Sequence, residues 1–355
     1  MRIGLIVAPW LPVPPTGYGG TELVVDALAR GFEREGHDVL LAASADSTCP
    51  VELLPGADPS DPAGISSNAT ELSHVVRAYA GMAGQVDLVH DHTLVGPLYR
   101  HRPADLPVVA TLHGPLNPQL ARIFHAAAPD TALVAISRNQ LRDTPGLSAT
   151  VIHHGIELGN VPVGSGSGGY AVFLGRLSPD KGVVEAVLTA RAAGIPLKIA
   201  AKMREPSELR YFHDAVEPLL ASDDEFVGEL GGAEKYRLLG DALALLSPIQ
   251  WQEPFGLVMI EAMATGTPVV TTPIGSAPEV VESGLTGYFG RTIEQLAAVL
   301  PYAADLDRAA VRARAEQRFS AARMVADHLA LYERLLGNDW HGRRHAETGA
   351  TASVS

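Results

Sequence analysis

One arrangement of segments occurs twice in this 355-residue chain: an apolar strand, a loop, an amphipathic helix and a second apolar strand. Apolar runs without polar alternation are typical of strands that are covered on both faces, as in parallel sheets. The repeat therefore predicts an α/β fold with two Rossmann-like, doubly wound parallel-sheet domains that face each other across a cleft. The first copy comprises 3–8, 21–36 and 38–44, and the second comprises 171–177, 181–194 and 196–203.

The segment VGSGSGGY separates the two copies, and its glycine and serine content predicts a flexible linker. A later run with helical spacing predicts a closing helix, and the polar residues after it have little to bury. The expected parts are a first domain at 1–162, a linker at 163–169, a second domain at 170–318, a closing helix at 319–337 and a disordered tail at 338–355. The candidate core contacts of the closing helix are Met324, Leu329, Leu331, Tyr332 and Leu335.

The composition excludes several classes of protein. A net charge of −13 argues against nucleic acid as the main partner, because binding the phosphate backbone requires a basic face. Cys49 is the only cysteine, so no internal disulfide is possible and a reducing compartment is expected. The first strand is interrupted by Pro9, too early for a signal peptide, and no apolar run reaches the roughly 18 residues of a membrane span. We expect a cytoplasmic protein without an integral membrane segment.

The loop after the first strand, PWLPVPPTGYGGTE, carries Gly17, Gly19 and Gly20 directly before a helix. Glycines there let backbone N–H groups approach a ligand, and a helix N-terminus favours anions. An ordinary long turn explains the same pattern. A dinucleotide oxidoreductase is disfavoured, because its G-x-G-x-x-G must follow the strand closely and the proline-rich stretch displaces these glycines.

Three histidines stand at predicted strand ends, in HDHT (90–93) and TLHG (111–114). His90 and His92 share one face of a strand, and with His113 they could form a metal site. No accompanying cysteine or H-E-x-x-H pattern supports a metal. Hydrogen bonding within the sheet edge is a second interpretation. We favour ligand contact, most strongly for His113, because the carboxyl ends of strands line the expected cleft.

Two cations follow the first strand of the second half, in GRLSPDKG (175–182). Arg176 stands at the strand end and Lys181 at the helix start, so both can reach one small volume. A guanidinium fork and an ammonium group that converge in this way suit a pyrophosphate. Two solvated loop cations are the alternative, which we disfavour in so acidic a chain.

The segment EPFGLVMIEAMATGTPVV (253–270) places a carboxylate on each side of a predicted helix start near Gly256 or Leu257. Free N–H groups of a first helical turn bind phosphate. Glu253 precedes the turn, and Glu261 lies about 6 Å along the helix axis from Leu257 at roughly 1.5 Å per residue. A sugar, a diphosphate and a ribose laid in a row would satisfy both acids.

These residues resemble the retaining glycosyltransferases of family 4, which have the GT-B fold. The likeness spans nearly the whole chain, through GYGGTE, HDHT, TLHG, AISRNQ, GRLSPDKG and the E-x7-E segment. The chain departs from the family at VIHHGIE, where many relatives have Pro-Asn-Gly-Ile-Asp, and this puts in doubt the contacts of His153 and His154.

The resemblance implies how a nucleotide-diphosphate sugar would be held in the second domain. Arg176 and Lys181 would bind the diphosphate with help from the N–H groups of Gly256 and Leu257, and Glu261 would hold the ribose. Such enzymes work without a bound metal or cofactor, so these groups would stabilise the charge on the leaving diphosphate.

The resemblance also implies contacts to the two sugars. Glu253 would touch the donor sugar, and His113 matches the position near its C6 side. Gly19 and Gly20 are further candidate donor contacts. The acceptor is expected largely on the first domain, with candidate contacts Glu22, His90 and His92.

The expected activity is the transfer of a hexose-type sugar, from a UDP-sugar or else a GDP-sugar, to a hydroxyl of a glycan, lipid or secondary metabolite. The family is thought to retain the anomeric configuration by a front-face route. Two alternatives stay open: a sugar-nucleotide epimerase or hydrolase on the same fold, and a non-catalytic protein that binds sugar nucleotides.

Overall fold

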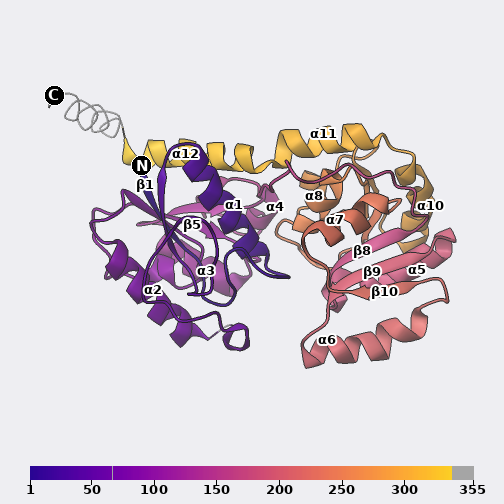
Figure 1. Cartoon of the computed structure of the whole chain (residues 1–355), viewed down its shortest axis with the longest axis horizontal. Coiled ribbons are helices and arrows are strands. Elements are labelled where there is room, and N and C mark those ends of the chain that lie inside the picture. The colour runs from indigo at the N-terminus through magenta and orange to yellow at the C-terminus, as the bar shows by residue number, and fades with distance from the viewer. Residues whose placement is uncertain (66, 338–355) are drawn as a thin grey trace.

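The computed structural model describes residues 1–65 and 67–337, and these residues form two parallel sheets (Figure 1). The first sheet has seven strands in the order β3-β2-β1-β4-β5-β6-β7, and the second has six in the order β10-β9-β8-β11-β12-β13. All the strand pairings in both sheets are parallel, as the uninterrupted apolar runs predict. The predicted tail at 338–355 lies outside the described residues.

The elements have the following bounds. The strands are β1 Arg2–Ile6, β2 Asp38–Ala42, β3 Glu52–Leu53, β4 Leu88–Asp91, β5 Val108–Leu112, β6 Ala132–Ala135, β7 Thr150–Val151, β8 Ala171–Arg176, β9 Leu197–Lys202, β10 Glu225–Gly228, β11 Leu245–Ser247, β12 Val269–Thr271 and β13 Gly287–Phe289. The α-helices are α1 Gly20–Arg34, α2 Asn68–Met82, α3 Pro118–Ala127, α4 Arg138–Leu141, α5 Val183–Ala193, α6 Pro206–Tyr211, α7 Gly232–Asp241, α8 Leu257–Ala264, α9 Ala277–Val280, α10 Ile293–Ala304, α11 Arg308–Phe319 and α12 Ala321–Leu336. Among the described residues, no helix has the length and apolar character to cross a membrane.

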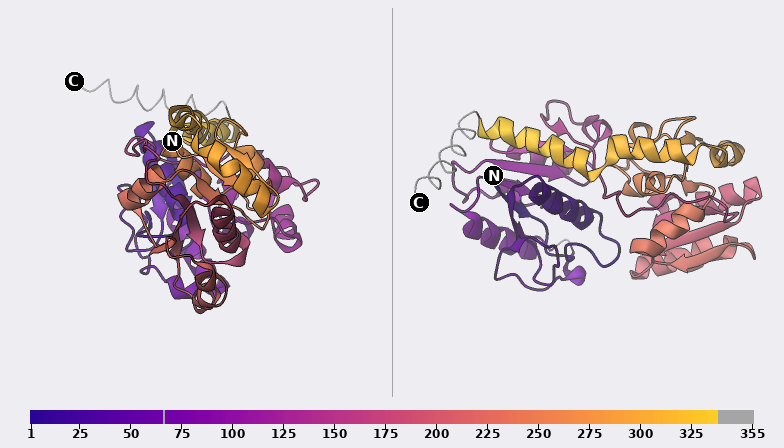
Figure 2. Two further views of the ribbon diagram at one scale, coloured as in Figure 1. Left: turned by 90° about the vertical axis from the view of Figure 1, so that its right-hand side faces the viewer. Right: turned by 45° about the horizontal axis from the view of Figure 1, so that its top comes forward.

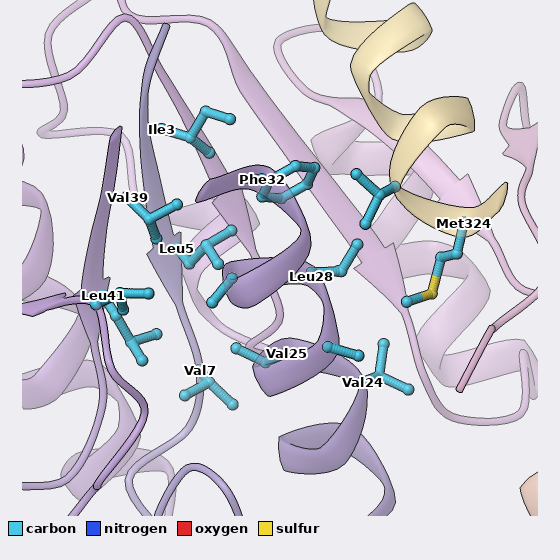
Figure 3. Packing of buried hydrophobic residues seen from close by; sticks show 14 of the residues in the cluster. Ile3, Leu5, Val7, Val24, Val25, Leu28, Phe32, Val39, Leu41 and Met324 are labelled. Atoms are coloured by element: carbon cyan, nitrogen blue, oxygen red, sulfur yellow. The ribbon is translucent and has the colours of Figure 1, made fainter. Parts of the chain in front are cut away.

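Helices cover both faces of the first sheet. Ile3 and Leu5 of β1 point into a cluster with α1 and α12, where Phe32 and Met324 are fully buried (Figure 3). Ile6 points the opposite way, into a cluster with α2. This alternation is the period of two expected of a strand, and burial on both faces explains why the sequence shows a continuous apolar run.

The second sheet is covered in the same way. Phe173 of β8 packs with α5 and α10, while its neighbour Val172 packs with α7, α8 and α11. The two sheets therefore have separate cores, and each is a doubly wound α/β layer structure.

The last two helices join the halves. α11 packs into the core of the second sheet through Val311 and Phe319, whereas α12 packs against the first sheet. Together they run along both halves (Figure 2). Met324, Leu331 and Tyr332 of α12 are buried as predicted and Leu329 packs against the same core, but Leu335 is 39% exposed. The prediction for Leu335 is wrong, because the helix presents that side chain to solvent.

The predicted linker is hydrogen-bonded to the second half of the chain. The N–H groups of Gly164, Gly166 and Gly168 donate to the carbonyls of Thr265, Gly240 and Asp241 at 2.9 to 3.0 Å. The Arg308 guanidinium also donates to the Gly164 carbonyl, at 2.8 Å. Hydrogen bonds of this kind restrain a segment whose composition alone predicts flexibility.

Candidate active site

A cavity of about 800 Å³ lies between the two sheets, at the ends of several strands. It is lined by residues of both halves, as expected for facing doubly wound sheets. The predicted site residues among its lining are Gly19, Gly20, Glu22, His113, Arg176, Lys181, Glu253, Gly256, Leu257 and Glu261. His90 and His92 are absent from this lining.

Lys181 and Glu253 form an ion pair in the cavity wall, with side chains 17% and 13% exposed. Glu253 also accepts a hydrogen bond from Trp251 Nε1 at 2.9 Å. Arg176 is held more loosely, since its closest contact, to Ser178 Oγ, is 3.3 Å long and its side chain is 40% exposed. The cation pair and the first acid of the E-x7-E segment thus occupy one small region, as the spacing predicts.

The second acid has a partner that the sequence analysis missed. Lys235 of α7 contacts Glu261 of α8, with 2.6 Å between Nζ and Oε1, and both side chains are largely buried. Lys235 belongs to no recognisable motif. The one sequence feature that could have indicated it is the pair Gly231 and Gly232, which precedes Lys235 by about one helical turn and is typical of a loop–helix junction. Lys235 also lines the cavity, together with Lys202 and Arg204, so three cations join the two predicted ones.

The helix start that should bind phosphate is at the predicted position. α8 begins at Leu257, and Gly256 before it has a left-handed φ of 82° that favours glycine. A Cβ on Gly20, at the start of α1, would lie 3.2 Å from Leu257 Cδ1. The start of α1 therefore lies close to the Leu257 side chain at the start of α8. Both helix starts line the cavity, and the free N–H groups of their first turns favour an anion there.

The glycine loop of the first half crosses to the second half. The Tyr18 N–H donates to Glu229 Oε1 at 2.8 Å, and Arg204 pairs with the other oxygen of the same carboxylate at 2.8 Å. A Cβ on Gly17 would lie 2.5 Å from Glu229 Oε1, so a side chain at this position would push the contact apart. Glycine here permits the close approach of the two halves.

His90 lies away from the cavity, in contrast to its predicted contact with an acceptor. It is fully buried between β4 and the C-terminal helix, with Nε2 2.7 Å from Thr111 Oγ1 and Nδ1 2.6 Å from the Tyr332 hydroxyl. This arrangement matches the alternative interpretation of hydrogen bonding within the sheet. No local sequence pattern could indicate the contact between His90 and Tyr332, because the two residues are 242 positions apart.

His92 supports the wall of the cavity without lining it. Its Nδ1 lies 2.8 Å from His113 Nε2, and its ring contacts the His90 ring at a tilt of 39°, with 4.0 Å between the centroids. His113 and His154 stack at 5.3 Å and both line the cavity. Of the two histidines at the position where the chain departs from the family, His154 lines the cavity and His153 instead contacts Glu279.

Burial lowers the pKa of His92, His113 and His154. Burial and the nearby His328 lower the pKa of His113 to about 4, and the pKa values of His92 and His154 fall well below the ordinary range for the same first cause. The imidazoles are therefore neutral at pH 7. A neutral His113 can donate or accept one hydrogen bond to a ligand but brings no positive charge to it.

Glu22 is buried in the first turn of α1 and lines the cavity. Burial raises its pKa to about 6. At pH 7 it is mostly ionised, and its carboxylate can accept hydrogen bonds from ligand hydroxyls. Among the described residues, no group of three or more His, Cys, Asp or Glu side chains is placed to hold a metal ion.

Two family profiles match the chain, one for each half. Residues 18–159 match "Glycosyltransferase Family 4" and residues 165–315 match "Glycosyl transferases group 1". With the two facing parallel sheets and the cavity between them, these matches define a glycosyltransferase of the GT-B type. The chain belongs to the family 4 glycosyltransferases.

Similar proteins support this assignment along most of the chain. An alpha-maltose-1-phosphate synthase of Mycobacterium tuberculosis (strain CDC 1551 / Oshkosh) is 27% identical over 94% of this chain and 100% of its own length. A D-inositol 3-phosphate glycosyltransferase of Mycobacterium sp. (strain KMS) is 30% identical over 74% of this chain and 70% of its own length. The crystal structure of AviGT4, a glycosyltransferase involved in avilamycin A biosynthesis, superposes with a TM-score of 0.72 at 27% identity, covering 95% of this chain and 98% of that one.

Proposed function

We propose that this enzyme moves a hexose-type sugar from a nucleotide-diphosphate sugar to a hydroxyl acceptor with retention of anomeric configuration. The observation that carries the proposal is the convergence of Arg176 and Lys181 with Glu253 and Glu261 around the start of α8. Two carboxylates separated by cations and by free N–H groups suit a ligand with hydroxyls at both ends and a diphosphate between them. A UDP-sugar is our first choice of donor and a GDP-sugar the second.

The proposed roles follow from charge and position. Arg176, Lys181 and the N–H groups at Gly256 and Leu257 stabilise the negative charge that grows on the leaving diphosphate. Glu253 accepts hydrogen bonds from hydroxyls of the donor sugar. The acceptor hydroxyl attacks from the face that the diphosphate leaves, and a leaving phosphate oxygen takes its proton. The proposal needs no resident metal or cofactor.

Glu261 takes the ribose in this scheme, and Lys235 orients it. A carboxylate whose Oε1 is bound by Lys235 at 2.6 Å has a fixed rotamer and keeps Oε2 for a ribose hydroxyl. On the other side of the cavity, His113 and the Gly19–Gly20 backbone face the donor sugar, and Glu22 is the candidate acceptor contact that lines the cavity.

The similar proteins suggest which acceptors to test first. One is named for alpha-maltose 1-phosphate and another for D-inositol 3-phosphate. We propose a screen of hexose phosphates and inositol phosphates ahead of lipids, glycans and secondary metabolites.

Donor binding is tested by thermal stabilisation with UDP, GDP, ADP, NAD and the matched nucleotide sugars. A ligand at 100 times its Kd should add about 2.7 kcal/mol to the free energy of unfolding. We expect one nucleoside diphosphate to stabilise the wild type and to lose this effect in Glu261→Ala. Stabilisation by NAD alone, or equal stabilisation of both proteins, would contradict the donor site.

Product analysis separates transfer from the alternatives. A transferase releases the nucleoside diphosphate quickly only when an acceptor is present, and the anomeric proton of the product reports retention. Rapid release without an acceptor would indicate a hydrolase, and a changed sugar on an intact nucleotide would indicate an epimerase. Donor binding without turnover for any acceptor would indicate a non-catalytic protein.

A further inference from the structure

A second pocket, of about 380 Å³, lies where the two halves of the chain meet, and it shares no lining residue with the active-site cavity. It is lined by Arg138 at the start of α4, by Arg314 and Arg318 near the end of α11, and by Arg323 at the start of α12. In a chain with a net charge of −13, four guanidinium groups around one pocket are an unusual concentration of positive charge.

The arginines are not fully neutralised by their neighbours. Arg314 and Arg318 donate to the same carboxylate oxygen, Glu282 Oε1, at 2.8 and 2.6 Å, so one negative charge serves two cations. Burial lowers the pKa of Arg318, and repulsion from Arg314 and Arg323 adds to this effect. The cations are thus close enough to interact unfavourably, which a bound anion would relieve.

Arg138 has no hydrogen-bond partner for its guanidinium among the described residues, and its side chain is exposed at the pocket. Its backbone N–H donates to Glu279 Oε2 at 2.9 Å, which fixes the place of the residue and leaves the side chain available. Arg323 carries a buried Nε without a partner, while its other nitrogens bind Asp327 and the carbonyls of His153 and His154. The carboxylates nearby, Glu279, Glu282 and Asp327, are fewer than the guanidinium groups.

We propose that this arginine pocket is a second ligand site, distinct from the active-site cavity, that binds a phosphate-bearing molecule. Guanidinium forks match the oxygens of a phosphate group and bind it through paired, charge-assisted hydrogen bonds. A volume of about 380 Å³ falls within the range of small-molecule sites.

The place of the pocket connects it to the active site. His153 lines the arginine pocket and the next residue, His154, lines the active-site cavity. Arg323 holds the carbonyls of both, at 2.7 and 2.9 Å. A ligand in the arginine pocket therefore lies one residue away from the wall of the cavity and touches elements that pack on both sheets.

The test is calorimetric titration of the full chain with inorganic phosphate. It is made in an Arg176→Ala/Lys181→Ala background, which weakens phosphate binding in the active-site cavity, and the effect of Arg138→Gln assigns the remaining binding to the arginine pocket. We expect one saturable site for phosphate. Arg138→Gln should raise its Kd about tenfold or more, because the loss of a hydrogen bond to a charged group weakens binding by about this factor. Arg138→Gln removes no contact within the described chain, so the variant should fold.

Arg122→Gln is the matched control, because Arg122 is an exposed arginine on α3 that lines neither pocket. It should leave the Kd of phosphate unchanged. Sedimentation with mixed phosphatidylcholine and phosphatidylglycerol vesicles distinguishes the source of the phosphate: binding that Arg138→Gln abolishes indicates a lipid headgroup, and phosphate binding without vesicle binding indicates a soluble ligand. Absence of saturable binding of both probes, or a phosphate Kd that Arg138→Gln and Arg314→Gln leave unchanged, overturns the proposal.

Discussion

Lys235 and Glu261, on the neighbouring helices α7 and α8, form an ion pair of 2.6 Å in the wall of the active-site cavity. The Glu261 side chain is only 6% exposed, and Lys235 is its ion-pair partner among the described residues. A second pair, between Lys181 and Glu253, lines the same cavity, so each acid of the E-x7-E segment has its own lysine.

Replacement of Lys235 by Met should destabilise the protein by about 3 kcal/mol, because it leaves a buried carboxylate without a partner. The double variant Lys235→Met/Glu261→Gln should recover most of this loss, since the unpaired charge is gone. Urea unfolding of the two variants measures both effects. A single variant as stable as the wild type would show that Glu261 does not depend on Lys235.

Replacement of Lys181 by Ala should lower kcat by roughly 10²–10³, as expected for the loss of one group that stabilises charge in the transition state. Steady-state kinetics with the donor and acceptor found in the screen measures it. The control is Lys198→Ala, which removes another ion-paired lysine, on β9 and outside the cavity lining. Near-normal turnover of the Lys181 variant would remove that residue from the mechanism.

Gly275→Ala should impair catalysis although Gly275 does not line the cavity. A Cβ there would lie 2.5 Å from the backbone N and 2.6 Å from the backbone O of Glu253, so the loop that carries this acid must shift. A displacement near 1 Å can cost about 10²-fold in rate. We expect kcat/KM to fall at least about tenfold.

Gly284→Ala is the matched control for the glycine experiment. Both glycines have a left-handed φ, 62° at Gly275 and 80° at Gly284. At Gly284, however, no atom lies within 4 Å of the position of the added Cβ. Both variants should therefore lose about 1–2 kcal/mol of stability from backbone strain. Gly275→Ala should lose more than this because its Cβ meets backbone atoms, and only Gly275→Ala should lose activity. Equal kinetics in the two variants would argue against a role for Gly275 in placing Glu253.

Tyr332→Phe should cost about 1–3 kcal/mol of unfolding free energy. The change removes the hydroxyl that lies 2.6 Å from His90 Nδ1 and leaves a buried ring nitrogen without a partner. Chemical denaturation measures the loss. Tyr302→Phe, at a side chain that is 65% exposed, should change stability by less than about 0.5 kcal/mol. The hypothesis fails if both variants behave alike.

Stability should fall as the pH drops from about 6.5 to about 4. Burial lowers the pKa of His113 and of His328 to about 4, so the unfolded chain takes up these protons at a higher pH than the folded one. Each such group favours the folded state fully above pH 6.5 and contributes a slope of up to about 1.4 kcal/mol per pH unit below it. Asp91 and Glu22, whose pKa values burial raises to about 6, have the opposite sign and offset part of the slope.

Urea unfolding at pH 7.5, 6 and 5 measures this dependence. His328→Leu removes one of the lowered pKa values, so the variant should lose less stability between pH 6 and 5 than the wild type. An identical loss in both proteins would show that His328 is not responsible for this part of the dependence.

The sequence by itself determined the fold class and the grouping of Arg176, Lys181, Glu253 and Glu261 around one helix start. Continuous apolar runs such as 171–177 require cover on both faces, and the Gly256–Glu261 helix start is specified by local residues. Arg176, Lys181, Glu253 and the start of α8 lie close together because they follow neighbouring parallel strands, β8 and β11, at the same sheet edge.

Only the tertiary structure decided the partners that come from distant parts of the chain. Lys235 reaches Glu261 because two helices pack on one face of the second sheet, and Tyr332 reaches His90 because α12 returns to the first sheet. HDHT looks the same whether its histidines face a ligand or a core. Whether His90 contacts a ligand or the core depends on its burial and on its contact with Tyr332, which is more than 200 residues away. No local pattern of residue types encodes such a contact.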